Sequence, residues 1–398
     1  MVSLEPDASG LFGAVHRRGP VAAIVGDAAY LEAMLRMEAA LARAQARVGL
    51  FPVEHADAIA AACQASRFEV DALGQAAAAA GNPVVPLVEQ LRVAVGGETA
   101  AHVHFGATSQ DIIDTATMLV ARPALDAILT TVDFAGDAAA RLATDHRETV
   151  MSGRTLLQQA LPTTFGAKAA GWLYGLDDAA DLLQSFRDRR LALQLGGGAG
   201  TLAALHPHGS EVVALVAGEL GLAAPDTPWH TNRSRIGELA GALGVTAGAL
   251  AKPARDVTLL AQTEIGEVRE GVPGRGGSSA MAHKRNPVAA IATLANTIQA
   301  PGLVATILTA SSGHEHERAA GAWHAEWHPL RELFIAVGSA AAWLADCLVH
   351  LEVDSARMRA NIGPDVEKLL DPPDYLASTG DIVAAALRRH TTRRENPG

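Results

Sequence analysis

Cysteine, aromatic side chains and positive charge are all scarce in this sequence. Only Cys63 and Cys347 occur in 398 residues, far apart and in apolar segments. They form neither a disulfide framework nor a CxxC metal pattern, so a reducing cytoplasm is the expected compartment. The formal net charge of -11 argues against a nucleic-acid partner, because phosphate binding needs a basic surface. It does not exclude an anionic substrate, which responds to the local field of a pocket.

Signals for secretion or membrane insertion are also missing. Met1–Gly10 contains acidic residues and lacks a basic region followed by an apolar run, so it is not expected to be a signal peptide. Arg, Asp or Glu is expected to interrupt each long helix, so none is predicted to cross a membrane. We therefore expect a protein without a membrane partner.

Apolar residues make up 49% of the sequence, whereas aromatic residues make up only 4%. A core built mainly from Ala, Leu and Val suits closely packed helices better than a β-sandwich. With 398 residues, the chain is long enough to bury several packed layers. We therefore predict an all-α protein composed of several structural parts.

Helical periodicity divides the chain into three parts. Residues 1–110 are predicted to form a small helical domain, 111–351 a long central bundle, and 352–398 a short helical appendage. The predicted helices cover residues 28–48, 53–63, 69–80, 111–144, 163–193, 210–220, 235–270, 287–311, 353–361 and 380–389. Several exceed the usual globular length of about 11–12 residues. Because a single subunit rarely covers so long an apolar stripe, we expect an oligomer.

The segment 271–287, GVPGRGGSSAMAHKRNP, is too rich in glycine to form a stable helix. It is predicted to be a mobile loop between two helices, suited to closing over a ligand. Composition alone favours a plain connection in which Lys284 and Arg285 are solvated. The order of its residues, however, favours a functional site.

This segment resembles the signature loop of the fumarase/aspartase superfamily, GSSxMPxKxNP. The pattern is matched by Gly277, Ser278, Ser279, Met281, Lys284, Asn286 and Pro287, and Ala282 replaces its first proline. The resemblance implies that Ser278 is the general base that handles the proton next to a substrate carboxylate. Because a serine hydroxyl is a weak acid, it needs backbone N–H groups or a cation such as Lys284 beside it. Ser279, Met281 and Asn286 are expected to contact the substrate.

A second segment, HVHFGATSQDIID at 102–114, resembles the superfamily element HxGxTSxD. His104, Thr108, Ser109 and Gln110 occupy its positions and are expected to bind substrate. Hydroxyl and N–H groups before a helix form a suitable carboxylate cradle, because the donors and the helix dipole converge there. Thr108 or Ser109 could instead simply cap the helix, which is compatible with that role. The HxH pair lacks a third ligand and is a poor zinc site.

The third segment, MSGRTLLQQALP at 151–162, resembles the superfamily pattern GRTHxQxAxP and places Arg154 and Gln159 at the substrate. Fumarases and related lyases carry a histidine on the general-acid side where this sequence has Leu156. Leucine cannot donate a proton, so a reaction that expels a strongly basic amine or hydroxide would be crippled. A carboxylate, whose conjugate acid has a pKa of about 4, departs without an acid. Leu156 is therefore compatible with opening or closing a lactone.

Further segments, at 195–205, 228–240 and 316–330, resemble the bacterial 3-carboxy-cis,cis-muconate cycloisomerases of this superfamily. Arg233 and Arg235 precede a predicted helix and could hold substrate carboxylates bidentately or lie as surface charges. His324 and His328 are one helical turn apart but lack the HExxH order of a zinc site. With Trp323 and Trp327, they are interpreted mainly as subunit-packing residues.

The resemblance implies a cycloisomerase that interconverts 3-carboxy-cis,cis-muconate and a carboxymuconolactone in protocatechuate catabolism. It also implies a cytoplasmic homotetramer with shared active sites, a polycarboxylate substrate, and no cofactor or metal. Two alternatives remain open: an adenylosuccinate- or argininosuccinate-type lyase that releases fumarate, and a catalytically silent scaffold. The intact Gly277-Ser278-Ser279 triplet argues against the scaffold.

Overall fold

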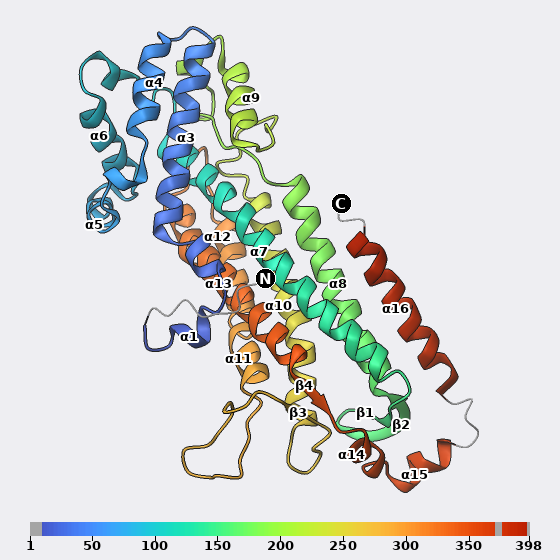
Figure 1. Cartoon of the computed structure of the whole chain (residues 1–398). Helices are drawn as coiled ribbons and strands as arrows, with labels where there is room; N and C mark the ends of the chain where they lie inside the picture. The colour runs from blue at the N-terminus through green and yellow to red at the C-terminus, as the bar shows by residue number, and fades with distance from the viewer. Residues whose placement is uncertain (1–9, 371–375, 396–398) are drawn as a thin grey trace.

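The structure is a computed structural model that describes residues 10–370 and 376–395 (Figure 1). The all-α prediction is confirmed, because helices dominate and the described strands form only two small sheets. Residues 1–9, which were expected not to form a signal peptide, and residues 371–375 and 396–398 of the predicted appendage lie outside the described residues. The division at residues 110 and 351 stays a prediction.

The shorter helices gather at one end of the molecule (Figure 1). They are α3 (Asp27–Arg47), α4 (Val53–Ala62), α5 (Val70–Ala80), α6 (Val84–Val95) and α9 (Gly209–Leu220). The short helices α1 (Gly13–His16) and α2 (Val21–Ile24) instead lie against the long helix at 322–349. Three predicted helices, at 28–48, 53–63 and 69–80, match α3, α4 and α5. Helix α6 was not predicted, because the pattern breaks at Pro83 and Gly96 conceal the twelve residues between them.

Four long helices form the central bundle and run side by side in Figure 1. They are α7 (Ser109–Asp145), α8 (Phe165–Arg189), α10 (Ser234–Leu260) and α13 (Ala322–Val349). Their contacting faces consist largely of buried Ala, Leu and Val, whose small size lets the helices approach closely. At about 1.5 Å per residue, the 37 residues of α7 span roughly 55 Å. The residues before α7 and those after it therefore lie at opposite ends of the bundle.

Two small antiparallel sheets, of two strands each, overlap the ends of predicted helices. Strands β1 (Val150–Thr155) and β2 (Gln158–Thr164) pair with each other, and α8 begins only after the Thr164 cap, which accepts a hydrogen bond from the Ala167 N–H. Strands β3 (Val268–Glu270) and β4 (Leu351–Val353) form the second pair. The prediction of one helix over 235–270 is wrong at its end. The chain leaves α10 at Leu260 and turns at Gly266, which has a φ of 59°.

The predicted single helix over 287–311 is two helices, α11 (Val288–Thr297) and α12 (Ala300–Ser312). The expectation that charges interrupt every long helix is wrong here, because no Asp, Glu, Lys or Arg occurs between residues 288 and 312. By length and composition, this stretch and α13 could each cross a membrane, but buried core helices share these properties. Burial of 89% identifies α13 as a core helix, whereas 288–312 is only 39% buried within the protomer.

The C-terminal part packs against the outside of the bundle. It contains α14 (Ser355–Ala360), α15 (Pro364–Glu367) and α16 (Ala377–Glu395), so helices are found where 353–361 and 380–389 were predicted. Helix α16 lies along α7 and α8 (Figure 1). His390 bridges Asp137 of α7 and Asp177 of α8, at 2.9 and 2.8 Å.

Candidate active site

The segment 271–287 is free of helix, as predicted, and closes on itself as a loop. Gly277 pairs with Arg285 in an antiparallel bridge, and the Asn286 side chain and backbone both donate to the Gly276 carbonyl, at 3.0 and 2.8 Å. A Cβ on Gly276, whose φ is 78°, would lie 2.3 Å from the Asn286 carbonyl oxygen. Glycine is therefore required at the neck of this loop.

Ser278 occupies a distinctive position within this loop. Its Oγ accepts hydrogen bonds from the backbone N–H groups of Ala280 and Met281, at 3.3 and 3.2 Å. Two donors aimed at one hydroxyl oxygen favour its deprotonated form. The Lys284 side chain is exposed, as are Ser279 and Met281, so these groups face a space outside the protomer.

The start of α7 holds the second set of predicted residues. Thr108 caps the helix in a reciprocal box with Asp111, and Ser109 is the first helical residue. His104 Nδ1 lies 2.7 Å from the buried Glu38 carboxylate. Burial alone would lower the pKa of His104, but the Glu38 charge and hydrogen bond outweigh burial and raise it. This end of α7 therefore offers a hydroxyl, N–H groups of the first turn and an imidazole paired with a buried carboxylate.

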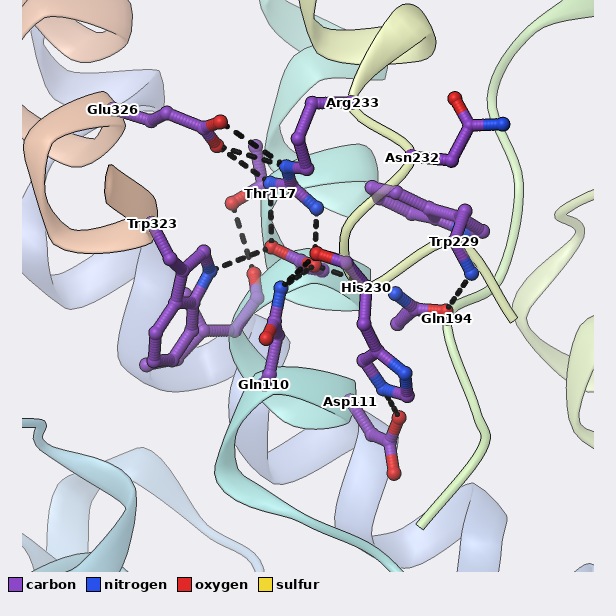
Figure 2. Close-up of polar contacts among 12 residues, drawn as sticks. Gln110, Asp111, Thr117, Gln194, Trp229, His230, Asn232, Arg233, Trp323 and Glu326 are labelled. Atoms are coloured by element: carbon purple, nitrogen blue, oxygen red, sulfur yellow. Dashed lines mark hydrogen bonds and ion pairs between the residues drawn. The ribbon is translucent and has the colours of Figure 1, made fainter. Parts of the chain in front are cut away.

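Gln110 and Arg233 lie in a buried network beside this site (Figure 2). Gln110 donates to Asp114 and to the His230 carbonyl, at 3.1 and 2.8 Å. The Arg233 guanidinium contacts Asp114 at 2.7 Å and Glu326 at 2.6 Å. Burial opposes the charged form, yet these carboxylates raise the pKa of Arg233. Arg233 is only 3% exposed, so the surface-charge alternative is wrong for it.

The aromatic residues near Glu326 pack within the protomer to different extents. Trp323 is buried and donates to Asp114 at 3.0 Å, so its interpretation as a subunit-packing residue is wrong (Figure 2). His324 is exposed, and its ring lies 4.7 Å from that of Trp327 at an interplanar angle of 47°. Arg235 is half-buried, lies over the Trp229 ring and donates to the Arg190 carbonyl.

The third set of residues lies on the β1–β2 hairpin. Arg154 forms a bidentate pair with Glu267, at 2.6 and 3.0 Å, and Glu267 is fully buried. The Gln159 amide donates to the Asn361 carbonyl at 2.8 Å and accepts from Ser152 at 2.9 Å. Both predicted residues are therefore fixed in place and anchor the hairpin to the protein body.

The tip of this hairpin is under backbone strain. Leu156 and Leu157 form a two-residue turn with φ values of 50° and 65°. Such a turn strongly favours Asn-Gly, because both central residues need a positive φ. Both leucines point outward, with 96% and 73% of their surfaces exposed. Strain of this kind persists where the surroundings demand it, and it marks the tip as a functional candidate.

The three sets do not meet within one protomer. Thr108 and Ser109 lie at the start of α7, whereas the hairpin follows its other end, roughly 55 Å away. The loop at 271–287 follows β3, beyond the far end of α10 from Arg233 (Figure 1). Among residues 10–370 and 376–395, no cluster of three or more His, Cys, Asp or Glu side chains could hold a metal ion.

Two buried carboxylates at this end, Glu267 and Glu270, were missed in the sequence. The predicted helix over 235–270 assigned both to a helical face. Their closeness to Gly266 and to the loop that begins at Gly271 was the available signal. Their roles as anchors become clear only from partners elsewhere in the chain, such as Arg154 for Glu267.

A family model described as Lyase matches residues 6–302 of the chain. Over 340 residues the chain is 48% identical to a 3-carboxy-cis,cis-muconate cycloisomerase of Bradyrhizobium diazoefficiens, covering 84% of this chain and 75% of the relative. It is 45% identical over 366 residues to a nitrosuccinate lyase of Streptomyces davaonensis, covering 89% and 77%. The crystal structure of a 3-carboxy-cis,cis-muconate lactonizing enzyme from Pseudomonas putida matches with a TM-score of 0.90 and 38% identity, covering 96% of this chain and 99% of that chain.

Proposed function

The chain belongs to the lyase family of the fumarase/aspartase superfamily, and from this premise we propose that it is a 3-carboxy-cis,cis-muconate cycloisomerase. It interconverts this tricarboxylate diene and a carboxymuconolactone in protocatechuate catabolism. The observation that carries the chemistry is the pair of backbone N–H groups on the Ser278 hydroxyl.

Ser278 handles the proton of the reaction. One substrate carboxylate attacks the conjugated alkene and forms the ring C–O bond. The alkene electrons move onto a second carboxylate, and the Ser278 hydroxyl gives its proton to the carbon beside it. The N–H groups of Ala280 and Met281 hold the resulting alkoxide, and the exposed Lys284 ammonium offsets the charge of the enediolate-like state. Solvent then returns the proton to Ser278.

Leu156 supports lactone chemistry over amine release. In the reverse reaction the leaving group is a carboxylate, the anion of an acid with a pKa of about 4, and it departs without a proton donor. The exposed leucine tip offers an apolar surface and no proton donor. The substrate, Ser278 and one proton from solvent account for every bond formed and broken, so the proposed reaction uses no cofactor or metal.

The active site is shared among copies in a homotetramer. The roughly 55 Å of α7 prevents Ser109 and Arg154 of one protomer from touching the same small substrate. The uncharged face of α11 and α12 exposes Ile291, Ile298 and Leu308, which suits burial against further copies. In the assembly, Thr108, Ser109 and His104 of one copy face the hairpin and the Ser278 loop of others. The free thiols and the acidic pI of about 5.7 fit a cytoplasmic enzyme.

A second candidate is elimination from nitrosuccinate. The 45% identity to a nitrosuccinate lyase favours this reaction. The lack of a proton donor at Leu156 is compatible with it as well. Nitrite, like a carboxylate, is the anion of a fairly strong acid and leaves without protonation. In that reaction Ser278 would remove the proton next to a carboxylate rather than deliver it.

Both substrates should be offered to the purified protein, with chelator present. We expect rapid loss of the diene ultraviolet absorbance of 3-carboxy-cis,cis-muconate, and no such loss with Ser278→Ala. Nitrite release from nitrosuccinate without any loss of the diene would shift the assignment to the second candidate. Inactivity on both substrates by a folded tetramer would overturn both proposals.

A further inference from the structure

The segment that leads into the Ser278 loop buries two carboxylates. Glu267 is fully buried, and the Glu270 side chain is 3% exposed. A buried charge without partners is strongly destabilising, so each carboxylate must be compensated by its neighbours. Glu267 pairs with Arg154 of the hairpin. Glu270 faces the other way, toward the Ser278 loop.

Glu270 joins the two ends of the loop. It is the last residue of β3, from which the loop departs, and its carboxylate oxygens accept from the N–H groups of Ala289 and Ala290, at 3.1 and 2.9 Å. Those N–H groups belong to the first turn of α11, where the loop returns. A negative charge is favourable at a helix N-terminus. One side chain therefore fixes both the exit and the return of residues 271–287.

Arg275 provides a second tie within the loop. Its guanidinium lies 2.7 Å from the Asp346 carboxylate and 4.0 Å from Glu270. Asp346, on α13, is 2% exposed and also pairs with Arg18 at 2.9 Å. The loop is thus held to the bundle core three residues before Ser278, while the residues after Ser278 are exposed.

We propose that Glu270 is a positioning residue that sets the place of Ser278, with the Arg275–Asp346 pair as its second tie. The inference rests on the proposed role of Ser278. Glu270 is not a catalytic residue, because its oxygens are buried and already bonded to Ala289 and Ala290. A displacement of about 1 Å in a reacting group can reduce turnover roughly 100-fold.

Glu270→Gln is the principal test. Glutamine keeps the size of the side chain but loses the charge and turns an NH2 group toward a backbone N–H donor. We expect kcat to fall roughly 100-fold, with KM changed much less. We also expect faster tryptic cleavage within the loop, at Arg275, Lys284 and Arg285, because a released loop is a better protease substrate.

Glu267→Gln is the matched control, because it makes the same substitution three residues earlier in the same segment. It disturbs Arg154 and the hairpin, so tryptic cleavage of the loop should stay at the wild-type rate. Cleavage that rises equally in both variants would overturn the inference, since it would indicate general loosening. Wild-type cleavage and kcat in Glu270→Gln would also overturn it.

Arg275→Met decides the question if Glu270→Gln does not fold. The Arg275 side chain is 22% exposed, and methionine keeps much of its aliphatic length while removing its charge. We expect faster cleavage at Lys284 and Arg285 and a lower kcat, and wild-type values for both would overturn the inference. A wild-type protein inactive on 3-carboxy-cis,cis-muconate would overturn the proposed cycloisomerase function, whereas loop cleavage would still report the anchoring.

Discussion

The β1–β2 hairpin and the Ser278 loop lie at the same end of the bundle but differ in how they are held and in how far their outer residues can move. The hairpin holds two leucines in a strained turn and is fastened by the buried Arg154–Glu267 pair. The loop is glycine-rich, is held at its base by Glu270 and by the Arg275–Asp346 pair, and leaves its outer residues exposed. A rigid arm presents an inert surface at a fixed place, whereas a loop that carries a reacting hydroxyl must be able to close over its substrate.

This comparison is tested first by removing each tip side chain. Ser278→Ala should lower kcat about 1000-fold, because positioned proton transfer contributes about 10²–10⁴. Leu156→Ala should lower it less than about tenfold, since the leucine supplies packing and no proton. Initial rates on 3-carboxy-cis,cis-muconate measure both effects. A loss of turnover in Leu156→Ala as large as that in Ser278→Ala would show that the hairpin tip does more than pack against the substrate.

Mixing variants tests whether one active site takes Ser109 from one copy of the chain and Ser278 from another. Ser109→Ala and Ser278→Ala alter opposite ends of the long helices, and each homo-oligomer should lose at least tenfold in kcat. Oligomers refolded from both should regain activity above the sum of the separate preparations, because some sites then carry neither substitution. Mixtures of Ser278→Ala with Lys284→Ala serve as the control and should regain nothing, because both changes fall in one loop. No recovery in the first mixture would place all residues of a site in one copy.

The contrast also explains what the sequence could reveal. The loop at 271–287 and Ser278 were predictable because glycine excludes a helix locally and the motif is contiguous. The N-terminal end of α7 was predictable from its capping residues. The anchoring of the hairpin was not predictable, because Arg154 and Glu267 lie 113 residues apart in the chain. Helical periodicity also extends across 235–270 and hides the loop-side position of Glu267. The buried ion pairs of Arg233 were not predictable for the same reason, since its partners Asp114 and Glu326 lie far from it in the chain.

The anchor of the hairpin should matter chiefly for stability. Arg154→Met leaves the fully buried Glu267 carboxylate without its guanidinium partner. Removal of one member of a buried pair typically destabilises by about 3–5 kcal/mol, and the Asn361 amide that remains bonded to Glu267 at 2.9 Å offsets part of this. Denaturant unfolding measures the difference. Arg269→Met is the control, because it breaks an exposed ion pair between Arg269 of β3 and Glu352 of β4. It should change the free energy of unfolding by about 1 kcal/mol or less.

The smallest expected effect concerns the strain in the turn itself. Leu157 has a φ of 65°, and this backbone conformation is unfavourable by about 1–2 kcal/mol for residues other than glycine. Leu157→Gly removes that strain but adds about 0.5–1 kcal/mol of chain entropy to be lost on folding, so we expect a gain of up to about 1 kcal/mol in unfolding free energy. Leu161→Gly, at a leucine within β2 that is 49% exposed, is the control and should be destabilising because it brings the entropy loss and some loss of packing without relieving any strain. If both variants lose stability equally, contacts of Leu157 with another copy outweigh its strain, and the tip is held in place by its neighbour rather than by its own hairpin.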